Sequence, residues 1–271
     1  MEVAVRGKPL DPSRREFVEM DYYQSGKADA GARVFAGPDA QPWERVLEHH
    51  EPLVPPAMRW LLSHPALASR IRGKVIDLGA GTCWTTALLS QHPLVDQVWA
   101  FDMSERFLLT TGRDMFLRWK GVEQKLRFAI GDFNALPFGE GEFDSAFLIA
   151  CLHHSVTPFL TLTEALRCVK RGGQVFVLEC PTATLSVRKG RAMALELSRG
   201  AATEVCYTAG ELEYLLQRAC LPLNGKSARF RRYPVDTHAR GWRWLVRRGL
   251  RYTGLEAVLR PTVFIYEIEV Q

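Results

Sequence analysis

The chain has 271 residues, of which 47% are hydrophobic and 24% are charged. This size and composition predict a globular protein with one large α/β domain, and two small domains are the open alternative. No apolar run reaches the length of a signal-peptide core or of a membrane span, so we expect a soluble protein of the cytoplasm.

The net charge of +5 is not spread evenly along the chain. Nine lysines and arginines lie between residues 226 and 251, a stretch in which Asp236 is the single acidic residue. Outside this stretch, acidic residues outnumber basic ones. The charge pattern therefore indicates one basic surface and not a general affinity for nucleic acid.

The six cysteines are scattered without any C-x-x-C pair. This spacing predicts neither a disulfide framework nor a zinc site. We therefore expect reduced thiols, mostly in the core, and no bound metal.

The first part of the chain, residues 1–69, predicts a helical arm or lid in front of a core at 70–271. Residues 1–40 are polar and punctuated by glycine and alanine, which predicts an extended arm with at most short helices. Apolar residues then follow a helical period from 43 to 62, and Pro52, Pro55 and Pro56 must kink or split that helix.

Beyond residue 70, strand-like and helix-like segments alternate, which is typical of a parallel sheet with right-handed crossovers. We predict strands at 75–77, 97–101, 125–130, 143–150 and 174–178, and a final strand at 263–270 whose partner lies between 221 and 235. One helix is predicted from Ser104 to about residue 120, one from Thr157 and Pro158 to 170–173, and one after a Thr208–Glu211 capping box. Insertions are expected at about 184–203, as a helix, and at 237–260.

One short run, Val75-Ile76-Asp77-Leu78-Gly79-Ala80-Gly81-Thr82-Cys83, predicts a strand, a tight turn and the start of a helix at 84–91. The two glycines permit positive φ and close approach of a ligand, and the helix start offers unpaired N–H groups. The run therefore predicts a polar-ligand site, or else an ordinary strand-to-helix turn. A dinucleotide fingerprint would need a third glycine where Trp84 stands, which argues against NAD or FAD.

Acidic residues end three successive strands, at Asp77, Asp102 and Asp132. Asp102 lies about 20 residues beyond the glycine turn, where nucleotide-binding sheets place a carboxylate that accepts from ribose hydroxyls, although it could also cap the next helix. Met103 offers a soft apolar contact for adenine. Because ligands of open α/β sheets bind at the carboxyl ends of the strands, these residues predict an adenosine site.

The glycine turn resembles motif I of the class I S-adenosylmethionine (SAM) methyltransferases. The string Gly131-Asp132-Phe133-Asn134-Ala135-Leu136-Pro137-Phe138 is similar to the motif in which that family's aspartate meets the adenine amino group and its neighbour packs on the ring. The resemblance covers residues 70–180 closely and points to the methyltransferase type 11-like group of small-molecule and sugar O-methyltransferases. It implies a Rossmann-like α/β fold, with a seven-stranded, mostly parallel sheet, a reversed C-terminal strand and helices on both faces.

The resemblance also implies SAM as the cofactor and S-adenosylhomocysteine (SAH) as its product. The implied cofactor contacts are Asp77, Gly79, Ala80, Gly81, Asp102, Met103, Asp132, Phe133, Cys151 and Tyr22. In the family, N-terminal segments cover the cofactor and the substrate, and Tyr22 or Tyr23 would do so here. Surface packing of the arm is the alternative.

Two histidines, His153 and His154, follow the fourth predicted strand, and imidazole titrates near neutral pH. Small-molecule O-methyltransferases with a similar Leu-His-His string use a histidine there and an acidic residue after the fifth strand, a place that Glu179 matches. The resemblance therefore implies methyl transfer to an oxygen of a small molecule, with His153 or His154 as base and Glu179 orienting the base or the acceptor. Either histidine could instead only pack against the cofactor.

Other functions remain open at this point. One is N- or C-methylation of a lipid-linked or acidic substrate. Another is a catalytically silent SAM-binding subunit that acts on a partner through the Arg-rich surface, and a third is a nucleotide-dependent reductase.

The insertion at 237–260 predicts a basic amphipathic helix, with Trp242 and Leu245 on one face and Arg243 and Arg247 on another. It could be a solvated lid, hold an anionic or lipid-linked substrate, or make peripheral contact with a membrane. The family's Asp/Asn-Pro-Pro-Tyr string for base amino groups is absent after the fourth predicted strand, which argues against nucleic acid as the partner. The oligomeric state is open.

Overall fold

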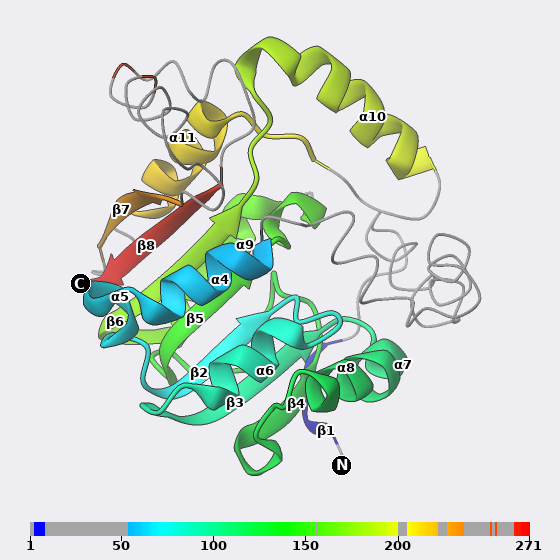
Figure 1. Ribbon diagram of the computed structural model, residues 1–271, viewed down its shortest axis with the longest axis vertical. Coiled ribbons are helices and arrows are strands. Elements are labelled where there is room, and N and C mark those ends of the chain that lie inside the picture. The colour runs from blue at the N-terminus through cyan, green and yellow to red at the C-terminus, as the bar shows by residue number, and fades with distance from the viewer. Residues whose placement is uncertain are drawn as a thin grey trace.

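The computed structural model describes residues 3–8, 54–155, 157–199, 205–221, 227–235, 250, 253 and 263–271. These residues form one sheet of eight strands in the order β1-β4-β3-β2-β5-β6-β8-β7, with helices on both faces (Figure 1). Neighbouring strands from β1 to β6 pair in parallel, and β8 is antiparallel to both β6 and β7. The predicted Rossmann-like sheet with a reversed C-terminal strand is therefore confirmed. The strands are β1 (Val3–Arg6), β2 (Gly73–Leu78), β3 (Val95–Asp102), β4 (Leu126–Ile130), β5 (Phe143–Ile149), β6 (Val169–Glu179), β7 (Ala228–Pro234) and β8 (Phe264–Val270).

The eighth strand, β1, was not expected from the sequence, which predicted seven strands and an N-terminal arm without a strand. β1 pairs with β4 at the edge of the sheet. Its residues alternate between half-buried and exposed, and Arg6 binds both carboxylate oxygens of Glu105 at 2.6 Å. The sequence pattern of these four residues is too short and too weak to predict a strand, because the strand forms only through its pairing with β4.

The helices follow the predicted order, with two differences in detail. They are α4 (Val54–Ser63), α5 (Pro65–Ala68), α6 (Trp84–Gln91), α7 (Glu105–Phe107), α8 (Arg113–Arg118), α9 (Pro158–Cys168), α10 (Val187–Arg199) and α11 (Ala209–Ala219). The predicted capping box of α11 is present in both directions. The expected continuous helix after Ser104 is instead divided by a π-helical turn, Leu108–Gly112. Residues 170–173 do not close α9 but belong to β6, because Val169 already pairs with Phe143 of β5.

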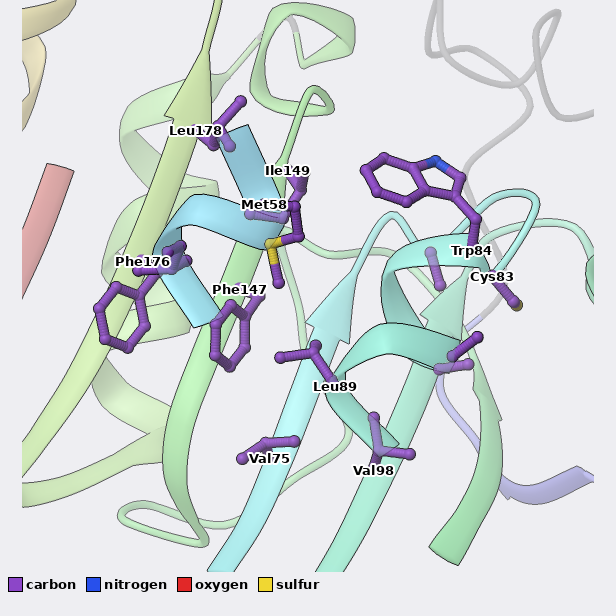
Figure 2. Close-up of a cluster of buried hydrophobic side chains, with 14 of the residues drawn as sticks. Met58, Val75, Cys83, Trp84, Leu89, Val98, Phe147, Ile149, Phe176 and Leu178 are labelled. Carbon is purple, nitrogen blue, oxygen red and sulfur yellow. The ribbon is translucent and has the colours of Figure 1, made fainter. Parts of the chain in front are cut away.

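The core lies in two layers, one on each face of the sheet. Successive strand residues alternate between the layers, as the period of two of a strand requires. Val75 and Phe147 face α4 and α6, whereas Ile76 and Leu148 face α9 and α11. Figure 2 shows the first layer, in which Met58 of α4 and residues of α6 meet side chains of the central strands. Within the described ranges, no helix combines the length and apolarity that a bilayer crossing needs.

Candidate active site

The glycine turn leaves β2 at Leu78 and enters α6 at Trp84. Gly79 and Gly81 have φ of +69° and +49°, a left-handed conformation that glycine adopts at little cost. The N–H groups of Gly79 and Ala80 both donate to the carbonyl oxygen of Phe101 on β3, at 2.9 and 3.0 Å. The turn therefore has the predicted conformation and is anchored to the neighbouring strand.

The start of α6 is shaped for a polar group. Cys83, at the N-cap position, is itself left-handed with φ +55° and gives no side-chain cap to the helix. The first N–H groups of an α-helix have no partner within the helix. An N-terminus without a capping side chain, placed at the carboxyl edge of a parallel sheet, suits a ligand that brings its own acceptors.

Asp102 closes β3 beside this turn. Its Oδ2 accepts from the N–H of Gly81 at 2.9 Å, and its Oδ1 accepts from the N–H of Ser104 at 3.0 Å. The two backbone donors fix the plane of the carboxylate and connect the glycine turn to the start of α7. Met103, which lies between Asp102 and Ser104 in the sequence, is half-buried. The contact of Asp102 with a ribose stays a prediction. The structure places the Asp102 carboxylate at the expected strand end, with both oxygens held by backbone N–H groups.

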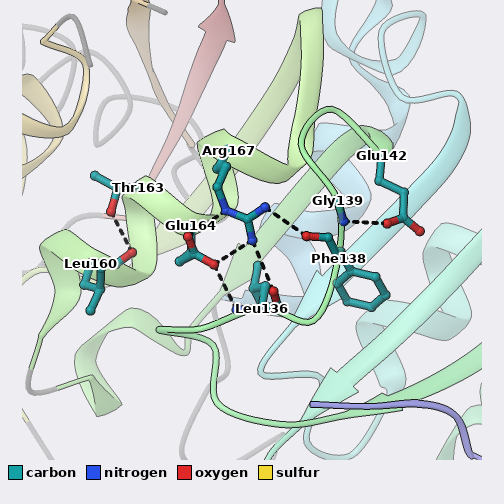
Figure 3. Close-up of polar contacts among 8 residues, drawn as sticks. All are labelled: Leu136, Phe138, Gly139, Glu142, Leu160, Thr163, Glu164 and Arg167. Carbon is teal, nitrogen blue, oxygen red and sulfur yellow. Dashed lines mark hydrogen bonds and ion pairs between the residues drawn. The ribbon is translucent and has the colours of Figure 1, made fainter. Parts of the chain in front are cut away.

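The loop after β4 carries Asp132 and Phe133. Asp132 Oδ1 accepts from the N–H of Asn134 at 2.8 Å, which makes a local turn, and half-buried Phe133 packs on the second core layer. Farther along, α9 holds this loop through Glu164, which accepts from the N–H of Leu136 at 2.9 Å. Arg167 adds bonds to the carbonyl oxygens of residues 136 and 138 (Figure 3). The proposed adenine loop is therefore fixed at both ends.

Asp77 lies beneath the turn and not on its surface. Its side chain is 1% exposed, and its Oδ2 accepts from the hydroxyl of Thr86 on α6 at 2.6 Å. Burial raises the pKa of Asp77 to about 7, and hydrogen bonds from Thr86 and Thr85 oppose that rise. The carboxyl group thus connects β2 to α6. A direct contact of Asp77 with the cofactor stays a prediction.

Cys151 supports the turn from the next strand. Its Sγ donates to the carbonyl oxygen of Leu78 at 3.1 Å, and burial raises the pKa of the thiol well above its usual range. A Cβ on Gly79 would lie 2.8 Å from the Cβ of Cys151. A side chain at residue 79 would therefore be disfavoured twice, by the positive φ and by the clash with Cys151. Residues 79 and 151 pack directly against each other.

Directly after Cys151, the short 3₁₀ helix Leu152–His154 places the two histidines. His153 Nδ1 lies 2.9 Å from Glu179 Oε2 at the end of β6, and the N–H of Leu152 donates to Glu179 Oε1 at 2.8 Å. Glu179 is 4% exposed. The rings of His153 and His154 lie side by side, with centroids 4.3 Å apart. The structure thus brings His153 and Glu179 together.

The arrangement joins the predicted groups at one edge. Asp102, the loop of Asp132, the glycine turn and the His153–Glu179 pair all lie at the carboxyl ends of the parallel strands. Tyr22, Tyr23 and the insertion at 237–260, apart from Leu250 and Thr253, lie outside the described residues. Among the described residues, no cluster of acidic, histidine and cysteine side chains could hold a metal ion.

Comparisons with known proteins support the same interpretation. Residues 76–177 match the model of the family described as "Methyltransferase domain" (Methyltransf_11). The fold matches that of the magnesium protoporphyrin IX methyltransferase of Synechocystis PCC 6803, solved with bound SAH, with a TM-score of 0.59 and 14% identity over 94% of this chain and 99% of that chain. Residues 76–177 therefore belong to a methyltransferase domain, and the surrounding fold is that of a SAM-dependent methyltransferase.

Two curated relatives share part of this methyltransferase domain. The chain is 35% identical over 107 residues to the ubiquinone/menaquinone biosynthesis C-methyltransferase UbiE of Cupriavidus taiwanensis, covering 39% of this chain and 42% of that protein. It is 30% identical over 133 residues to the demethylmenaquinone methyltransferase of Clavibacter sepedonicus, covering 48% and 51%. The chain thus spans about half the length of these relatives, or less.

Sequence reasoning missed two features of the methyltransferase domain and its surroundings. Gly112, in the π-helical turn, lies against the glycine turn, so that a Cβ there would be 2.9 Å from the carbonyl oxygen of Gly81. Tyr207 has a buried hydroxyl without a partner among the described residues, and burial together with Glu179 raises its pKa. Neither could be found from spacing, because each feature depends on residues that are far apart in the chain.

Proposed function

We propose that the protein transfers a methyl group from SAM to a small-molecule acceptor in the cytoplasm, with His153 as general base and Glu179 as the residue that orients it. The observation that carries this proposal is the hydrogen-bonded His153–Glu179 pair beside the glycine turn. Cys151, which packs against Gly79, is only two residues before His153. The base and the turn are therefore held at a fixed separation.

The residues of the turn fit SAM. The left-handed glycines leave the backbone of the turn open to close approach by a ligand, and the uncapped start of α6 offers N–H donors. Asp102 presents an oriented carboxylate for ribose hydroxyls. When bound, SAM supplies an electrophilic methyl group. The task of the chain is to align the acceptor with that methyl and to exclude water.

Glu179 sets the proton positions on His153. In the proposed pair the Nδ1–H of His153 donates to Glu179 Oε2, since a carboxylate oxygen accepts. The lone pair of the neutral ring is then on Nε2, which can take a proton from the acceptor. The N–H of Leu152 holds the other oxygen of Glu179. His154, whose ring is tilted against that of His153 with centroids 4.3 Å apart, would shape the acceptor side without taking the proton.

The acceptor is proposed as a hydroxylated small molecule. Removal of a hydroxyl proton raises the nucleophilicity of the oxygen, and in a phenol it also raises that of the neighbouring ring carbon. O-methylation is the first candidate. C-methylation is the second, and it is supported by the names of the curated relatives, which are C-methyltransferases or demethylmenaquinone methyltransferases. An anionic or lipid-linked acceptor held by 237–260 fits the charge of that segment.

The test compares three variants, His153→Gln, Glu179→Gln and His154→Gln, by calorimetry with SAH and by turnover of a panel of phenolic and hydroxylated acceptors with methyl-deuterated SAM. We expect all three to bind SAH like the wild type. We expect His153→Gln to lower turnover by about 10²- to 10⁴-fold, the range of general base catalysis, and His154→Gln by less than about tenfold. NMR of the labelled product distinguishes O- from C-methylation. Equal losses in the two histidine variants would contradict the assigned base, and absence of SAH binding by the wild type would contradict the whole proposal.

A silent SAM-binding subunit makes a different prediction. It would bind SAH, turn over no acceptor, and co-purify with another protein. A reductase is disfavoured by the match of residues 76–177 to a methyltransferase domain and by Trp84 in place of the third glycine.

A further inference from the structure

Three buried polar side chains lie between two segments of the proposed active site. They are Asn134, Thr161 and Ser155, which are 6%, 1% and 0% exposed. Asn134 follows Asp132 by two residues in the loop after β4, and Ser155 directly follows His154. Thr161, on α9, bonds to both of the other side chains. We call these three side chains the Thr161 network.

The hydrogen bonds of the Thr161 network run in one direction. The hydroxyl of Thr161 donates to Asn134 Oδ1 at 2.6 Å, a much shorter distance than the 3.5 Å to the carbonyl oxygen of Thr157. Because this hydroxyl has a single proton, its bond with Ser155, at 2.9 Å between the oxygens, uses the proton of Ser155. Ser155 Oγ accepts in turn from the N–H of Thr157 at 3.2 Å.

Each end of the network is bonded to a segment with a proposed role. The N–H of Asn134 donates to Asp132 Oδ1 at 2.8 Å, within the loop proposed to meet adenine. The N–H of Ser155 donates to the carbonyl oxygen of Leu152 at 3.0 Å. That bond closes the histidine turn, residues 152–155, which carries His153. The network therefore connects the cofactor side of the site to the side of the proposed base.

Thr161 differs from the other residues that hold these two segments. Glu164 of α9 accepts from the N–H of Leu136 and so holds the loop after β4, whereas Glu179 of β6 holds the histidine turn. Each of these carboxylates fixes one side of the site. The hydroxyl of Thr161 bonds to both sides at once, so it sets their separation.

The side-chain amide of Asn134 depends on its bond with Thr161. Its Nδ2 is buried without a partner among the described residues, and its Oδ1 accepts from Thr161. A valine at residue 161 would occupy nearly the same volume but would leave this oxygen and the hydroxyl of Ser155 without their shared partner. Buried polar groups without partners are costly. Loss of the Thr161 hydroxyl should therefore displace the two segments relative to each other.

We propose that Thr161 is a positioning residue for methyl transfer: its hydroxyl holds the histidine turn and the loop of Asp132 at one separation, so that His153 is aligned with the acceptor when the cofactor is bound. This inference rests on the proposed function for the roles of the two segments. A misplacement of about 1 Å can lower turnover about 10²-fold even when its cause lies outside the reacting groups. Thr161 therefore acts through His153 and Asp132 and not by touching the substrate.

The test compares Thr161→Val, which removes the hydroxyl, with Thr161→Ser, which keeps it. Calorimetry gives the affinity for SAH, the acceptor panel gives kcat at saturating SAM, and thermal unfolding is measured in parallel. We expect Thr161→Val to lower kcat by about 10- to 100-fold and to weaken SAH binding by about fivefold, and Thr161→Ser to stay close to the wild type. The matched control is Thr163→Val on the same helix, where the hydroxyl bonds to the carbonyl oxygen of Leu160 at 2.9 Å (Figure 3). This variant should resemble the wild type.

Substitutions at the two ends of the network separate positioning from general stability. Ser155→Ala changes the histidine turn and should nevertheless weaken SAH binding. Asn134→Ala changes the loop after β4 and should nevertheless lower kcat at saturating SAM. In a Thr161→Val background both of these cross-effects should disappear, because the network is already broken. A loss of thermal stability alone would not produce this pattern.

The imidazole signals of His153 report the position of the base without turnover. They are recorded by NMR in the protein with ¹⁵N-labelled histidine and are assigned by their loss in His153→Gln. We expect Asn134→Ala and Thr161→Val to shift these signals, and Thr161→Ser and Thr163→Val to leave them in place. This measurement decides the role of Thr161 even if the wild type turns over no acceptor, a result that would contradict the proposed function alone.

Two results would overturn the inference. One is an unchanged set of His153 signals in Asn134→Ala and Thr161→Val, and the other is an equal loss of turnover in Thr161→Val and Thr161→Ser. If Thr161→Val does not fold, the cross-effects of Ser155→Ala and Asn134→Ala carry the test. Their absence would then contradict the coupling of the two segments.

Discussion

Substitution of Gly79 by alanine should damage the glycine turn in two separable ways. The φ of +69° costs a residue with a Cβ about 1–2 kcal/mol. The new Cβ would also lie 2.8 Å from the Cβ of Cys151, well inside the 3.5–4.0 Å at which carbon atoms make favourable contact. Overpacking of this kind typically costs about 1–3 kcal/mol. We therefore expect Gly79→Ala to lower the free energy of unfolding by about 2–5 kcal/mol and to weaken SAH binding.

A second substitution separates the two terms. Cys151→Gly removes the opposing Cβ, whereas Cys151→Ala keeps it and removes only the sulfur. In a double-mutant cycle, Gly79→Ala should therefore couple to Cys151→Gly by about 1–3 kcal/mol and only weakly to Cys151→Ala, and the φ term should remain in both. Denaturant unfolding gives the free energies of the cycle, and calorimetry gives the affinity of each variant for SAH. Equal coupling to both variants, or tolerance of Gly79→Ala alone, would show that the contact between residues 79 and 151 does not limit the turn.

Two more predictions concern groups around this turn. Gly112→Ala should weaken SAH binding by about tenfold, because its Cβ would lie 2.9 Å from the carbonyl oxygen of Gly81 and 3.0 Å from Cys83 Sγ. The matched control is Gly210→Ala in α11, where a Cβ would meet open space, and this variant should be neutral or slightly stabilising. Equal SAH affinities of the two variants would contradict the contact between Gly112 and the glycine turn. The raised pKa of Asp77, about 7 against an ordinary 3.8, means that the folded state binds a proton that the unfolded state releases between these values. The free energy of unfolding should therefore fall by up to about 4 kcal/mol as pH rises from about 4 to 7. Urea titrations at several pH values should show a smaller fall in the Asp77→Asn variant. The same pH dependence of the unfolding free energy in both proteins would show that Asp77 is not the titrating group.

The choice between the two histidines illustrates what spacing could not provide. His153 and His154 are adjacent in the sequence, and their position after β5 does not indicate which of them is oriented by a carboxylate. Only the folded sheet brings Glu179, from the end of β6, to within 2.9 Å of His153. The identity of the oriented ring is therefore a property of the pairing of β5 with β6.

The sequence by itself determined the elements whose signals are local. The glycine turn, the alternation of strands and helices, and the capping box of Thr208 and Glu211 all depend on residues within a few positions of one another, through φ preferences, side-chain period and hydrogen bonds to nearby backbone. These features were predicted and are present.

Tertiary structure alone decided the features that join distant segments. The place of β1 beside β4 and the packing of Gly112 on the glycine turn both require contacts between residues that the chain keeps far apart. Such contacts leave no periodic trace in the sequence, because their energy depends on which surfaces the sheet order brings face to face.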